Sequence, residues 1–316
     1  MKIVVLDADT LGRDLDLFPL SDCGEVQVYG GTSPEQIAER LEGADAVLVN
    51  KIKLNAVTLA GNESLRLICV AATGYDNIDI SYCRERGIAV CNVVGYSTDS
   101  VAQLTAAMVL SLYTHIPEYT ASVADGRYTS GGVANRLTPV YHELSGKTWG
   151  IIGYGNIGKK VGEIARAFGC RVLAYKRNPD APECVDLHTL LRESDIISLH
   201  TPLNAESRGM IGKTELALTE KKPVIINVAR GAVWDEAAVA EAVTDGTLGG
   251  IGCDVYSTEP FPADHPFFVI KDLPNVCLTP HMAWGSYEAR RRCLGEIVQN
   301  IEAFKRGELR SRVDLI

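Results

Sequence analysis

Three side chains suited to proton transfer and anion binding follow three apolar, strand-like runs in the second half of the chain. Arg230 comes after VIINVA, Glu259 follows the run GIGCDV, and His281 comes after VCLTP. In an open α/β sheet, ligands bind at the edge formed by the carboxyl ends of the strands. We therefore expect the guanidinium, the carboxylate and the imidazole to meet at one such edge.

These residue types together suit the reduction of a 2-keto acid. Arg230 offers a planar fork of donors to carboxylate and carbonyl oxygens. His281 can give up a proton near neutral pH, and Glu259 beside it would stabilise the charged imidazole and fix its tautomer. A cofactor would supply the hydride, and acid–base help would add about 10²- to 10⁴-fold in rate.

Each of the three residues also has an ordinary structural explanation. A single histidine after a strand often makes only structural hydrogen bonds. Glu259 stands before Pro260, as a turn residue would, and Arg230 could pair with Asp235. The catalytic interpretation therefore depends on a cofactor site nearby.

A glycine-rich turn provides such a site. The stretch GIIGYGNIG has the spacing G-x-G-x-x-G between an apolar strand and a helical pattern. The first glycine permits a tight turn, the second lets the backbone approach a pyrophosphate, and the third lets the helix lie close to the strand. The helix N-terminus would offer N–H groups to phosphates, although a tight turn without a ligand is the alternative. The candidate cofactor-binding residues of this turn are Gly153, Tyr154, Gly155, Asn156, Ile157 and Gly158.

The residues after the next strand bear on the choice of cofactor. The run VLAYKRNP carries Lys176 and Arg177 where dinucleotide-binding folds usually have an acid that accepts hydrogen bonds from ribose hydroxyls. Lysine and arginine cannot accept these bonds, but they can pair with a 2′-phosphate. The residue types therefore favour NADP(H) over NAD(H), unless both side chains point to solvent.

Short β-branched runs alternate with helical patterns along the chain, which predicts parallel sheets covered by helices on both faces. We predict an α/β fold of two Rossmann-like or flavodoxin-like parallel-sheet domains with a cleft between them. The substrate domain would comprise residues 1–98 and 287–316, and the dinucleotide-binding domain residues 99–286. The expected strands lie at 2–8, 25–30, 46–50, 65–72, 88–93, 147–155, 171–177, 196–202, 223–230, 249–255 and 275–281, and the expected helices at 34–43, 77–87, 100–117, 156–169, 235–246 and 286–306.

Composition and charge argue against several classes of function. The net charge of -9 and the pI of about 5.3 disfavour nucleic-acid or anionic-membrane partners. The nine cysteines form no C-x-x-C pair and lie mostly in apolar surroundings, which indicates reduced thiols in a cytoplasmic protein and no metal site. The charge-free segment 100–117 is short for a membrane span and contains polar residues, so we expect a buried or interface helix.

Taken together, the chain resembles the D-isomer-specific 2-hydroxyacid dehydrogenases, and most closely their glycerate dehydrogenase and hydroxypyruvate reductase branch. The resemblance runs through nearly the whole chain in the expected order. The matching stretches are ATGYDNID (72–79), NVVGYSTDSVAQL (92–104), LSGKTWGIIGYGNIGKKV (144–161), INVARGAVWDEAAVAEA (226–242), GCDVYSTEP (252–260) and LTPHMAW (278–284).

The resemblance implies roles for individual residues. Arg230, Glu259 and His281 match the catalytic arginine, glutamate and histidine of the family. It also implies that two domains close over the substrate and that a homodimer forms through the cofactor domain, a role that the segment 100–117 would fit. The implied substrate-binding residues are Ala72, Thr73, Gly74, Arg230, His281 and Trp284, and the further cofactor-binding residues are Thr98, Thr201, Pro202, Ser207, Val228, Ala229 and Asp254.

Two positions depart from the family pattern. Lys176 stands where many members carry aspartate, and Trp284 is bulkier than the residue that many relatives have, which would favour small substrates such as hydroxypyruvate or glyoxylate. The expected activity is the reduction of such a 2-keto acid to the D-2-hydroxy acid with NAD(P)H. The alternative is an NAD(P)-sensing, corepressor-like binding protein with little turnover. Formate oxidation in a related fold needs no proton donor and would leave Glu259 without a purpose.

Overall fold

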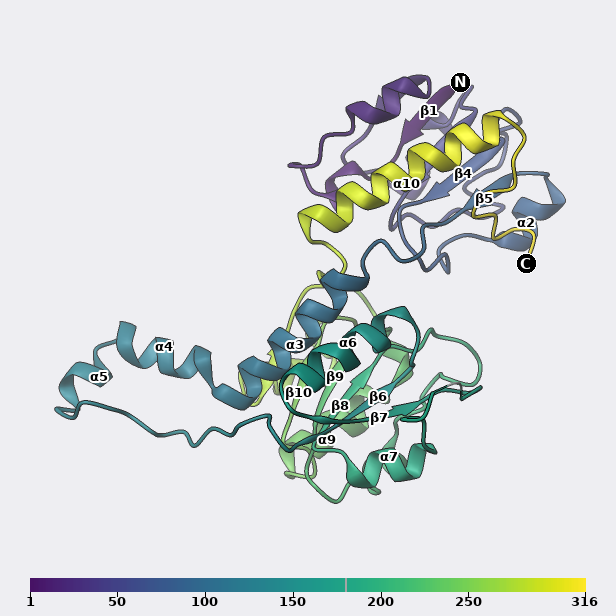
Figure 1. Cartoon of the computed structure of the whole chain (residues 1–316). Coiled ribbons are helices and arrows are strands. Elements are labelled where there is room, and N and C mark those ends of the chain that lie inside the picture. The colour runs from purple at the N-terminus through teal and green to yellow at the C-terminus, as the bar shows by residue number, and fades with distance from the viewer. Residues whose placement is uncertain (180) are drawn as a thin grey trace. The chain divides into compact units, whose positions relative to one another are not determined.

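The predicted strands form two parallel sheets, each in its own unit of the chain (Figure 1). The computed structural model describes residues 1–179 and 181–316. One unit comprises residues 1–97 and 285–316, and the other comprises residues 98–284. Every strand pair in both sheets is parallel among the described residues, which confirms the predicted α/β fold class.

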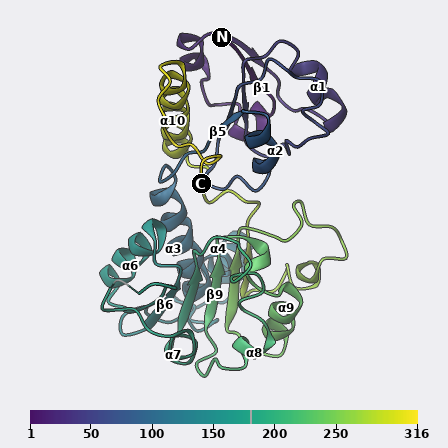
Figure 2. The same ribbon diagram turned by 90° about the vertical axis from the view of Figure 1, so that its right-hand side faces the viewer.

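The sheet of the first unit has the order β2-β1-β3-β4-β5. Its strands β3, β4 and β5 are buried along their whole length because helices cover both faces. Helices α1 and α2 pack on one face, while α10 lies against β4 on the other side (Figure 2). The bounds are β1 Lys2–Val5, β2 Glu25–Val28, α1 Ile37–Arg40, β3 Ala46–Val49, β4 Leu67–Val70, α2 Ile80–Glu85, β5 Ala89–Cys91 and α10 Tyr287–Lys305, with short 3-10 helices at Ala8–Leu11, Phe18–Asp22 and Pro34–Gln36.

The sheet of the second unit has the order β11-β10-β9-β8-β6-β7. One apolar core joins it to α3 and α6, and a second core on its other face joins it to α7, α8 and α9. The bounds are α3 Thr98–Thr114, α4 Ile116–Ala124, α5 Arg127–Ser130, β6 Thr148–Ile152, α6 Asn156–Ala167, β7 Arg171–Tyr175, α7 Leu187–Glu193, β8 Ile196–Leu199, α8 Lys213–Leu216, β9 Val224–Asn227, α9 Glu236–Thr244, β10 Gly250–Cys253 and β11 Val276–Leu278, with 3-10 helices at Gly231–Val233 and Pro266–Val269.

The helix expected at 100–117 ends earlier than predicted. It stops at Thr114, because His115 adopts a left-handed conformation with φ of 51°, and α4 begins at Ile116. Helix α3 packs on β9, β10 and β11 of its own sheet. Helices α4 and α5 and the extended chain up to residue 143, here called the arm, stand away from this sheet (Figure 1). The sequence reasoning did not foresee the arm.

All nine cysteines lie within the described residues as free thiols, and seven of them are buried. Burial raises the pKa of Cys83 and of Cys91 to about 11, so both stay protonated near neutral pH. The burial of these thiols agrees with the apolar residues that flank most of the cysteines in the sequence.

Candidate active site

The glycine-rich turn follows β6, at the point where the chain connections reverse their direction across the sheet. β7 lies on one side of β6 and β8 on the other, and such a switch point is where open α/β sheets bind ligands. Gly153 has φ of +96°, and a Cβ there would lie 2.5 Å from the backbone N of Thr201. A Cβ on Gly158 would lie 2.2 Å from the carbonyl oxygen of Gly153. Backbone atoms therefore exclude a side chain at both positions.

Gly155 differs because no neighbour among the described residues would clash with a side chain there. A Cβ there would meet no atom within 4 Å, so the space beside its backbone is open at the N-terminus of α6. Asn156 and Ile157 begin this helix, whose first N–H groups suit a phosphate. The ring of Tyr154 is buried in the core, and its hydroxyl donates to Glu183 at 2.5 Å. The turn as a whole therefore fits a dinucleotide.

The sheet of the first unit has a switch point of the same kind, but the chain fills it with its own carboxylate. Asp7 follows β1, which lies between β2 and β3. The Asp7 carboxylate accepts hydrogen bonds from the backbone N atoms of Asn50, Lys51 and Ile52 at 2.7–3.2 Å. Burial raises the pKa of Asp7, and these N–H donors oppose the shift. The glycine turn of the second unit is therefore the better candidate for an anionic cofactor.

Lys176 and Arg177 follow β7, the strand that pairs with β6. Nη1 of Arg177 lies 2.9 Å from Oε2 of Glu206, and both side chains are largely exposed. An exposed ion pair contributes at most about 1 kcal/mol. Arg177 could therefore exchange Glu206 for a phosphate at little cost.

The loop after β8 folds back on itself. The buried hydroxyl of Ser207 donates to the carbonyl oxygen of Pro202 at 2.6 Å and accepts from the backbone N of Asn204 at 2.8 Å. The hydroxyl of Ser207, one of the expected cofactor-binding residues, is thus engaged in closing this loop. Thr201 lies against the glycine turn, since its backbone N is the atom nearest to a Cβ built on Gly153.

Arg230 is presented by a turn that Asn227, the last residue of β9, holds in place. The fully buried amide of Asn227 accepts from the backbone N of Ala229 and donates to the carbonyl oxygen of Arg230, both at 3.0 Å. Nη1 of Arg230 donates to the carbonyl oxygen of Ala229 at 2.8 Å. A Cβ on Gly231 would lie 2.0 Å from the carbonyl carbon of Tyr256, so a glycine after Arg230 lets the loops after β9 and β10 touch.

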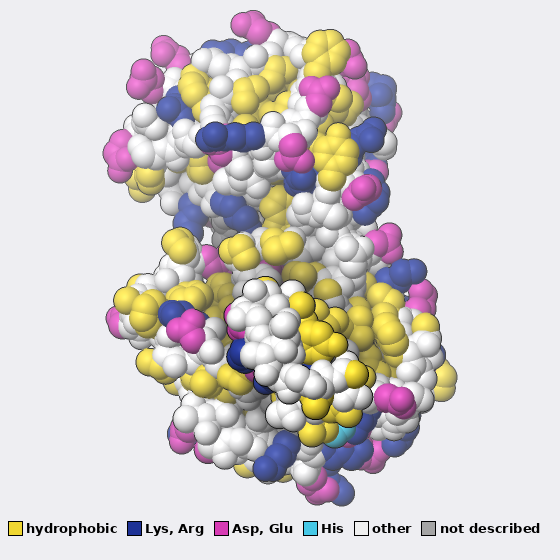
Figure 3. All heavy atoms as spheres, turned by 90° about the vertical axis from the view of Figure 1, so that its left-hand side faces the viewer, with side chains coloured by type: hydrophobic (Ala, Val, Ile, Leu, Met, Phe, Trp, Pro, Cys, Tyr) yellow, Lys and Arg dark blue, Asp and Glu magenta, His cyan; other side chains and the backbone are white. Residues whose placement is uncertain are grey.

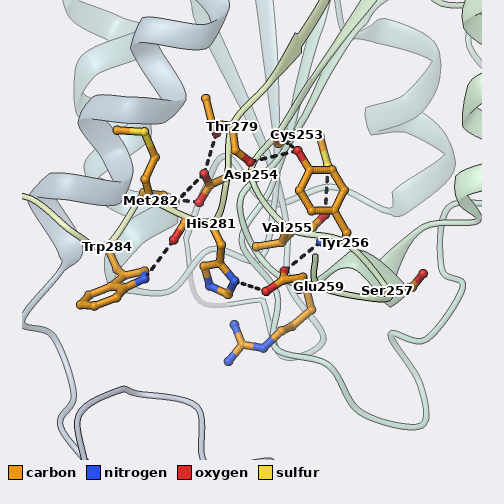
Figure 4. A network of polar contacts seen from close by, with 12 residues as sticks. Cys253, Asp254, Val255, Tyr256, Ser257, Glu259, Thr279, His281, Met282 and Trp284 are labelled. Atoms are coloured by element: carbon orange, nitrogen blue, oxygen red, sulfur yellow. Dashed lines mark hydrogen bonds and ion pairs between the residues drawn. The ribbon is translucent and has the colours of Figure 1, made fainter. Parts of the chain in front are cut away.

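Asp254, which follows β10, holds the loop that carries His281. Its fully buried carboxylate accepts from the hydroxyl of Thr279 at 2.5 Å and from the backbone N atoms of Met282 and Ala283 at 2.8 Å (Figure 4). Burial raises the pKa of Asp254, and these donors oppose the shift. Removing the carboxylate would leave buried donors without a partner, at a cost of about 1–3 kcal/mol each.

A histidine–glutamate pair lies at the same edge of the sheet (Figure 4). Nδ1 of His281 lies 2.6 Å from Oε2 of Glu259, whose Oε1 accepts from the backbone N of Tyr256 at 3.0 Å. An ionised carboxylate only accepts hydrogen bonds, so Nδ1 carries the proton and Nε2 can exchange a proton with a ligand. His281 has φ of 55°, and the indole of Trp284 donates to its carbonyl oxygen at 3.1 Å.

The structure brings the three candidate catalytic residues to one sheet edge. β9, β10 and β11 are neighbours whose last residues are in register, and Arg230, Glu259 and His281 follow these three strands. The hydroxyl of Tyr256 donates to the carbonyl oxygen of Thr279 at 2.9 Å, which joins the loop of Glu259 to the loop of His281. Of the remaining cofactor candidates, Thr98 begins α3, and Val228 packs against the core that contains α3 and α6.

The expected substrate-binding loop follows β4 in the first unit. Residues that follow β5 hold it by hydrogen bonds. The hydroxyl of Thr73 donates to the carbonyl oxygen of Val93 at 2.8 Å, and the amide of Asn92 donates to the carbonyl oxygen of Thr73 at 2.7 Å. The backbone N of Val93 donates to the carbonyl oxygen of Ala72 at 3.0 Å. Ala72, Thr73 and Gly74 thus begin a loop whose backbone is fixed within that unit.

Sequence reasoning missed two residues that build this site, Asn227 and Tyr256. Asn227 could have been noticed as a polar residue that closes the apolar run PVIIN. Tyr256 gives no such signal, because a tyrosine after a strand is an ordinary core residue. Its contacts to both catalytic loops appear only in the folded chain.

Within residues 1–179 and 181–316, no group of three or more His, Cys, Asp or Glu side chains could hold a metal ion. The helices in this part of the chain are all too short or too polar to cross a membrane.

Comparisons with known proteins agree with this geometry. A family model described as D-isomer specific 2-hydroxyacid dehydrogenase, NAD binding domain, matches residues 106–283. The chain is 38% identical to a glycerate dehydrogenase of Methylorubrum extorquens over 99% of both chains. It is 37% identical to a hydroxypyruvate reductase of Blautia hydrogenotrophica, covering 97% of this chain and 98% of that protein.

Solved structures share the fold over nearly the whole chain. An acyclic imino acid reductase in complex with NADPH and D-Arg has a TM-score of 0.86 and 28% identity, covering 99% of this chain and 100% of that one. A D-lactate dehydrogenase from Aquifex aeolicus, in complex with NAD and lactic acid, has a TM-score of 0.82 and 28% identity, covering 98% and 96%.

Proposed function

Because the chain belongs to the D-isomer-specific 2-hydroxyacid dehydrogenase family, we propose that it reduces a small 2-keto acid to the D-2-hydroxy acid with NAD(P)H. Hydroxypyruvate and glyoxylate are the proposed substrates. The observation that carries the proposal is the contact of 2.6 Å between His281 Nδ1 and Glu259 Oε2. These two residues follow β11 and β10, and β10 pairs with β9, the strand that Arg230 follows. The contact of His281 with Glu259 gives a histidine whose Nε2 can donate a proton.

The chain's own residues would divide the work of the reaction. The guanidinium of Arg230 would hold the carboxylate and polarise the carbonyl of the keto acid. His281 would give its Nε2 proton to the carbonyl oxygen, and Glu259 would stabilise the imidazolium form before that transfer. A nicotinamide cofactor bound at the glycine turn would supply the hydride.

The size of the substrate would be limited near His281 by Trp284. The indole of Trp284 donates to the carbonyl oxygen of His281, so its ring is fixed beside the proposed proton donor. The N–H groups of Ala72, Thr73 and Gly74 are the proposed partners of the substrate carboxylate. The first assignment rests on the bulk of the indole, in which this chain departs from the family pattern, and it favours substrates with a short chain. The second assignment follows the family resemblance.

A substrate panel tests this function. Hydroxypyruvate, glyoxylate and pyruvate would each be assayed with NADH and with NADPH by following oxidation of the cofactor. We expect turnover of at least one keto acid. If none of them oxidises either cofactor while the protein still binds it, the NAD(P)-sensing alternative is the better explanation.

NADPH is the proposed preferred cofactor, because Lys176 and Arg177 stand where an acid would hold the ribose hydroxyls. Lys176→Asp is expected to lower the ratio of kcat/KM for NADPH to that for NADH by about 10- to 100-fold, since a hydrogen bond to a charged group contributes about 1.5–3 kcal/mol. Lys213→Asp on the exposed face of α8 is the matched control and should leave the ratio unchanged. An unaltered ratio in Lys176→Asp would show that this side chain faces solvent.

A homodimer through the cofactor domain is also proposed, and the arm is its best-supported site. Helix α3 packs on α6 and on its own sheet, whereas the arm exposes a series of large apolar side chains. Figure 3 views the second unit from the side on which the arm stands and shows apolar side chains gathered around it. An exposed apolar surface of this kind is typical of a contact with another chain and supports the proposal. The exposed apolar residues of the arm are Ile116, Val123, Tyr128, Val133, Leu137, Val140 and Tyr141.

Charged substitutions in the arm test the dimer. Val123→Glu combined with Leu137→Glu should convert a dimer to a monomer in sedimentation, because each site loses about 1.5–3 kcal/mol of apolar burial and would bury a charge. Val57→Glu is the control, since Val57 is exposed in the first unit. A wild-type protein that sediments as a monomer would refute the proposal.

A cytoplasmic location is also proposed. The free, mostly buried thiols of the described residues support it, because cysteines stay reduced in that compartment.

A further inference from the structure

A buried polar cluster lies next to the loop that carries Glu259. It consists of Glu236, the first residue of α9, together with Ser257 and His265. Glu236 is 8% exposed and His265 is 6% exposed. Ionisable side chains are rarely buried unless they are paired, and neither residue takes part in the proposed reaction directly. The cluster therefore needs an explanation of its own.

Three donors converge on the carboxylate of Glu236. Oε1 accepts from the backbone N of Ser257 at 2.8 Å, and Oε2 accepts from the hydroxyl of Ser257 and from Nε2 of His265, the latter at 3.0 Å. Nδ1 of His265 accepts from the backbone N of Phe267 at 3.1 Å, so Nε2 carries the ring proton. His265 is thus neutral, and the charge of the carboxylate lies at the N-terminus of α9, where the helix dipole favours it.

The cluster is joined to the catalytic pair through the backbone. Ser257 follows Tyr256, whose N–H donates to Oε1 of Glu259 and whose hydroxyl donates to the loop that carries His281 (Figure 4). The two bonds from Ser257 to Glu236 fix the peptide that follows Tyr256. The ring of Tyr256 also packs edge-on against His265. The orientation of Glu259 thus depends on where Glu236 holds Ser257.

The same point is where the loop of Arg230 touches the loop of Glu259. A Cβ on Gly231 would lie 2.0 Å from the carbonyl carbon of Tyr256 and 2.2 Å from the backbone N of Ser257. A shift of Ser257 would therefore move the backbone of both the Arg230 loop and the Glu259 loop. Side chains that act at this point influence the geometry of the catalytic set without touching a ligand.

We propose that Glu236 is a positioning residue of the reaction: by holding Ser257 from the first turn of α9, it keeps Glu259 within reach of His281. This inference rests on the proposed function, in which His281 donates the proton. The arrangement requires a carboxylate. A glutamine would present its NH₂ group either to the N–H of Ser257 or to the Nε2–H of His265, so one donor would always face another donor.

Glu236→Gln is expected to lower kcat about tenfold, because misplacement of a catalytic group by about 1 Å can cost up to about 10²-fold. The dissociation constant of NADPH should stay unchanged, since the hydrogen bonds of Glu236 go to Ser257 and His265 and not to the glycine turn after β6. Glu241→Gln, on the exposed side of the same helix, is the matched control and should keep the wild-type kcat.

A double-mutant cycle separates positioning from a general loss of structure. Glu236→Gln should have almost no effect on kcat in a Glu259→Gln background, because the group through which it acts is already gone. If it costs the same factor in both backgrounds, the positioning role is wrong. Ser257→Ala, which removes a single donor, serves as the milder variant if Glu236→Gln fails to fold. Its loss of kcat should likewise disappear in the Glu259→Gln background, and persistence of that loss would overturn the inference.

Assays of the wild-type protein distinguish a failure of the Glu236 role from a failure of the proposed function. Turnover by wild type, with equal losses in both backgrounds, would overturn the role of Glu236 and leave the proposed function standing. Absence of turnover by wild type with every keto acid and both cofactors would overturn the proposed function and this inference together.

Discussion

His281→Asn should lower kcat for keto-acid reduction by about 10² or more while leaving cofactor binding intact. Asparagine is the sharpest replacement here for two reasons. It tolerates the left-handed conformation that His281 adopts, with φ of 55°, so the loop should keep its shape. Its NH₂ group can also donate to Glu259 as Nδ1 does, but an amide N–H is too weak an acid to transfer its proton to a substrate.

The measurement is kcat with the best keto acid of the panel, together with the dissociation constant of the cofactor. His188→Asn, at an exposed position of α7, is the control and should behave as wild type. His281→Ala should lose at least as much kcat, because it also leaves Glu259 without its partner. Full kcat in His281→Asn would rule out His281 as the proton donor and would make Glu259 the next candidate.

The strands and the sheet edge that carry this site could be predicted from local sequence. Runs such as WGII (149–152) and PVII (223–226) contain no polar side chain, which is typical of strands buried on both faces. The glycine turn could be predicted because its spacing and its place between a strand and a helix are local properties. The sequence positions of Arg230, Glu259 and His281 then placed all three at one edge, since parallel strands end on the same side.

The supports of the site could not be predicted, because they join residues far apart in the chain. The carboxylate of Asp254, an expected cofactor-binding residue, holds Thr279 and two backbone N–H groups of the loop after it, contacts that the sequence does not reveal. Glu236 and His265 are 29 positions apart and look like ordinary surface residues in the sequence. A buried carboxylate can be recognised only in the folded structure, where its hydrogen-bond donors come together.

The arm was missed for a related reason. The segment 116–143 mixes apolar side chains with glycine, proline and charges, and it has no regular period that would predict an element. Its apolar residues do not serve the core of their own unit, so periodicity within one chain gives no information about them. Helix α3, which contains the charge-free segment from residue 100 onward, packs on α6 and on β9, β10 and β11 of its own sheet.

Arg230→Lys should lower kcat/KM for the keto acid by about 10²- to 10³-fold, the usual cost of losing a donor to a developing oxyanion. Lysine keeps the positive charge but cannot offer the planar fork that binds a carboxylate and a carbonyl oxygen together. The turn should survive the change, because Asn227 holds it through the carbonyl oxygen of residue 230 and the backbone N of Ala229, both of which remain.

Arg192→Lys on α7, where the guanidinium pairs with Glu220 at the surface, is the control for a general arginine effect. Because Arg230 would act on both the bound keto acid and the transition state, we expect KM to rise as well as kcat to fall, whereas His281→Asn should change kcat almost alone. This contrast assigns the two roles separately. An unchanged kcat/KM in Arg230→Lys would mean that charge alone suffices and that the fork geometry at this sheet edge has no part in holding the substrate.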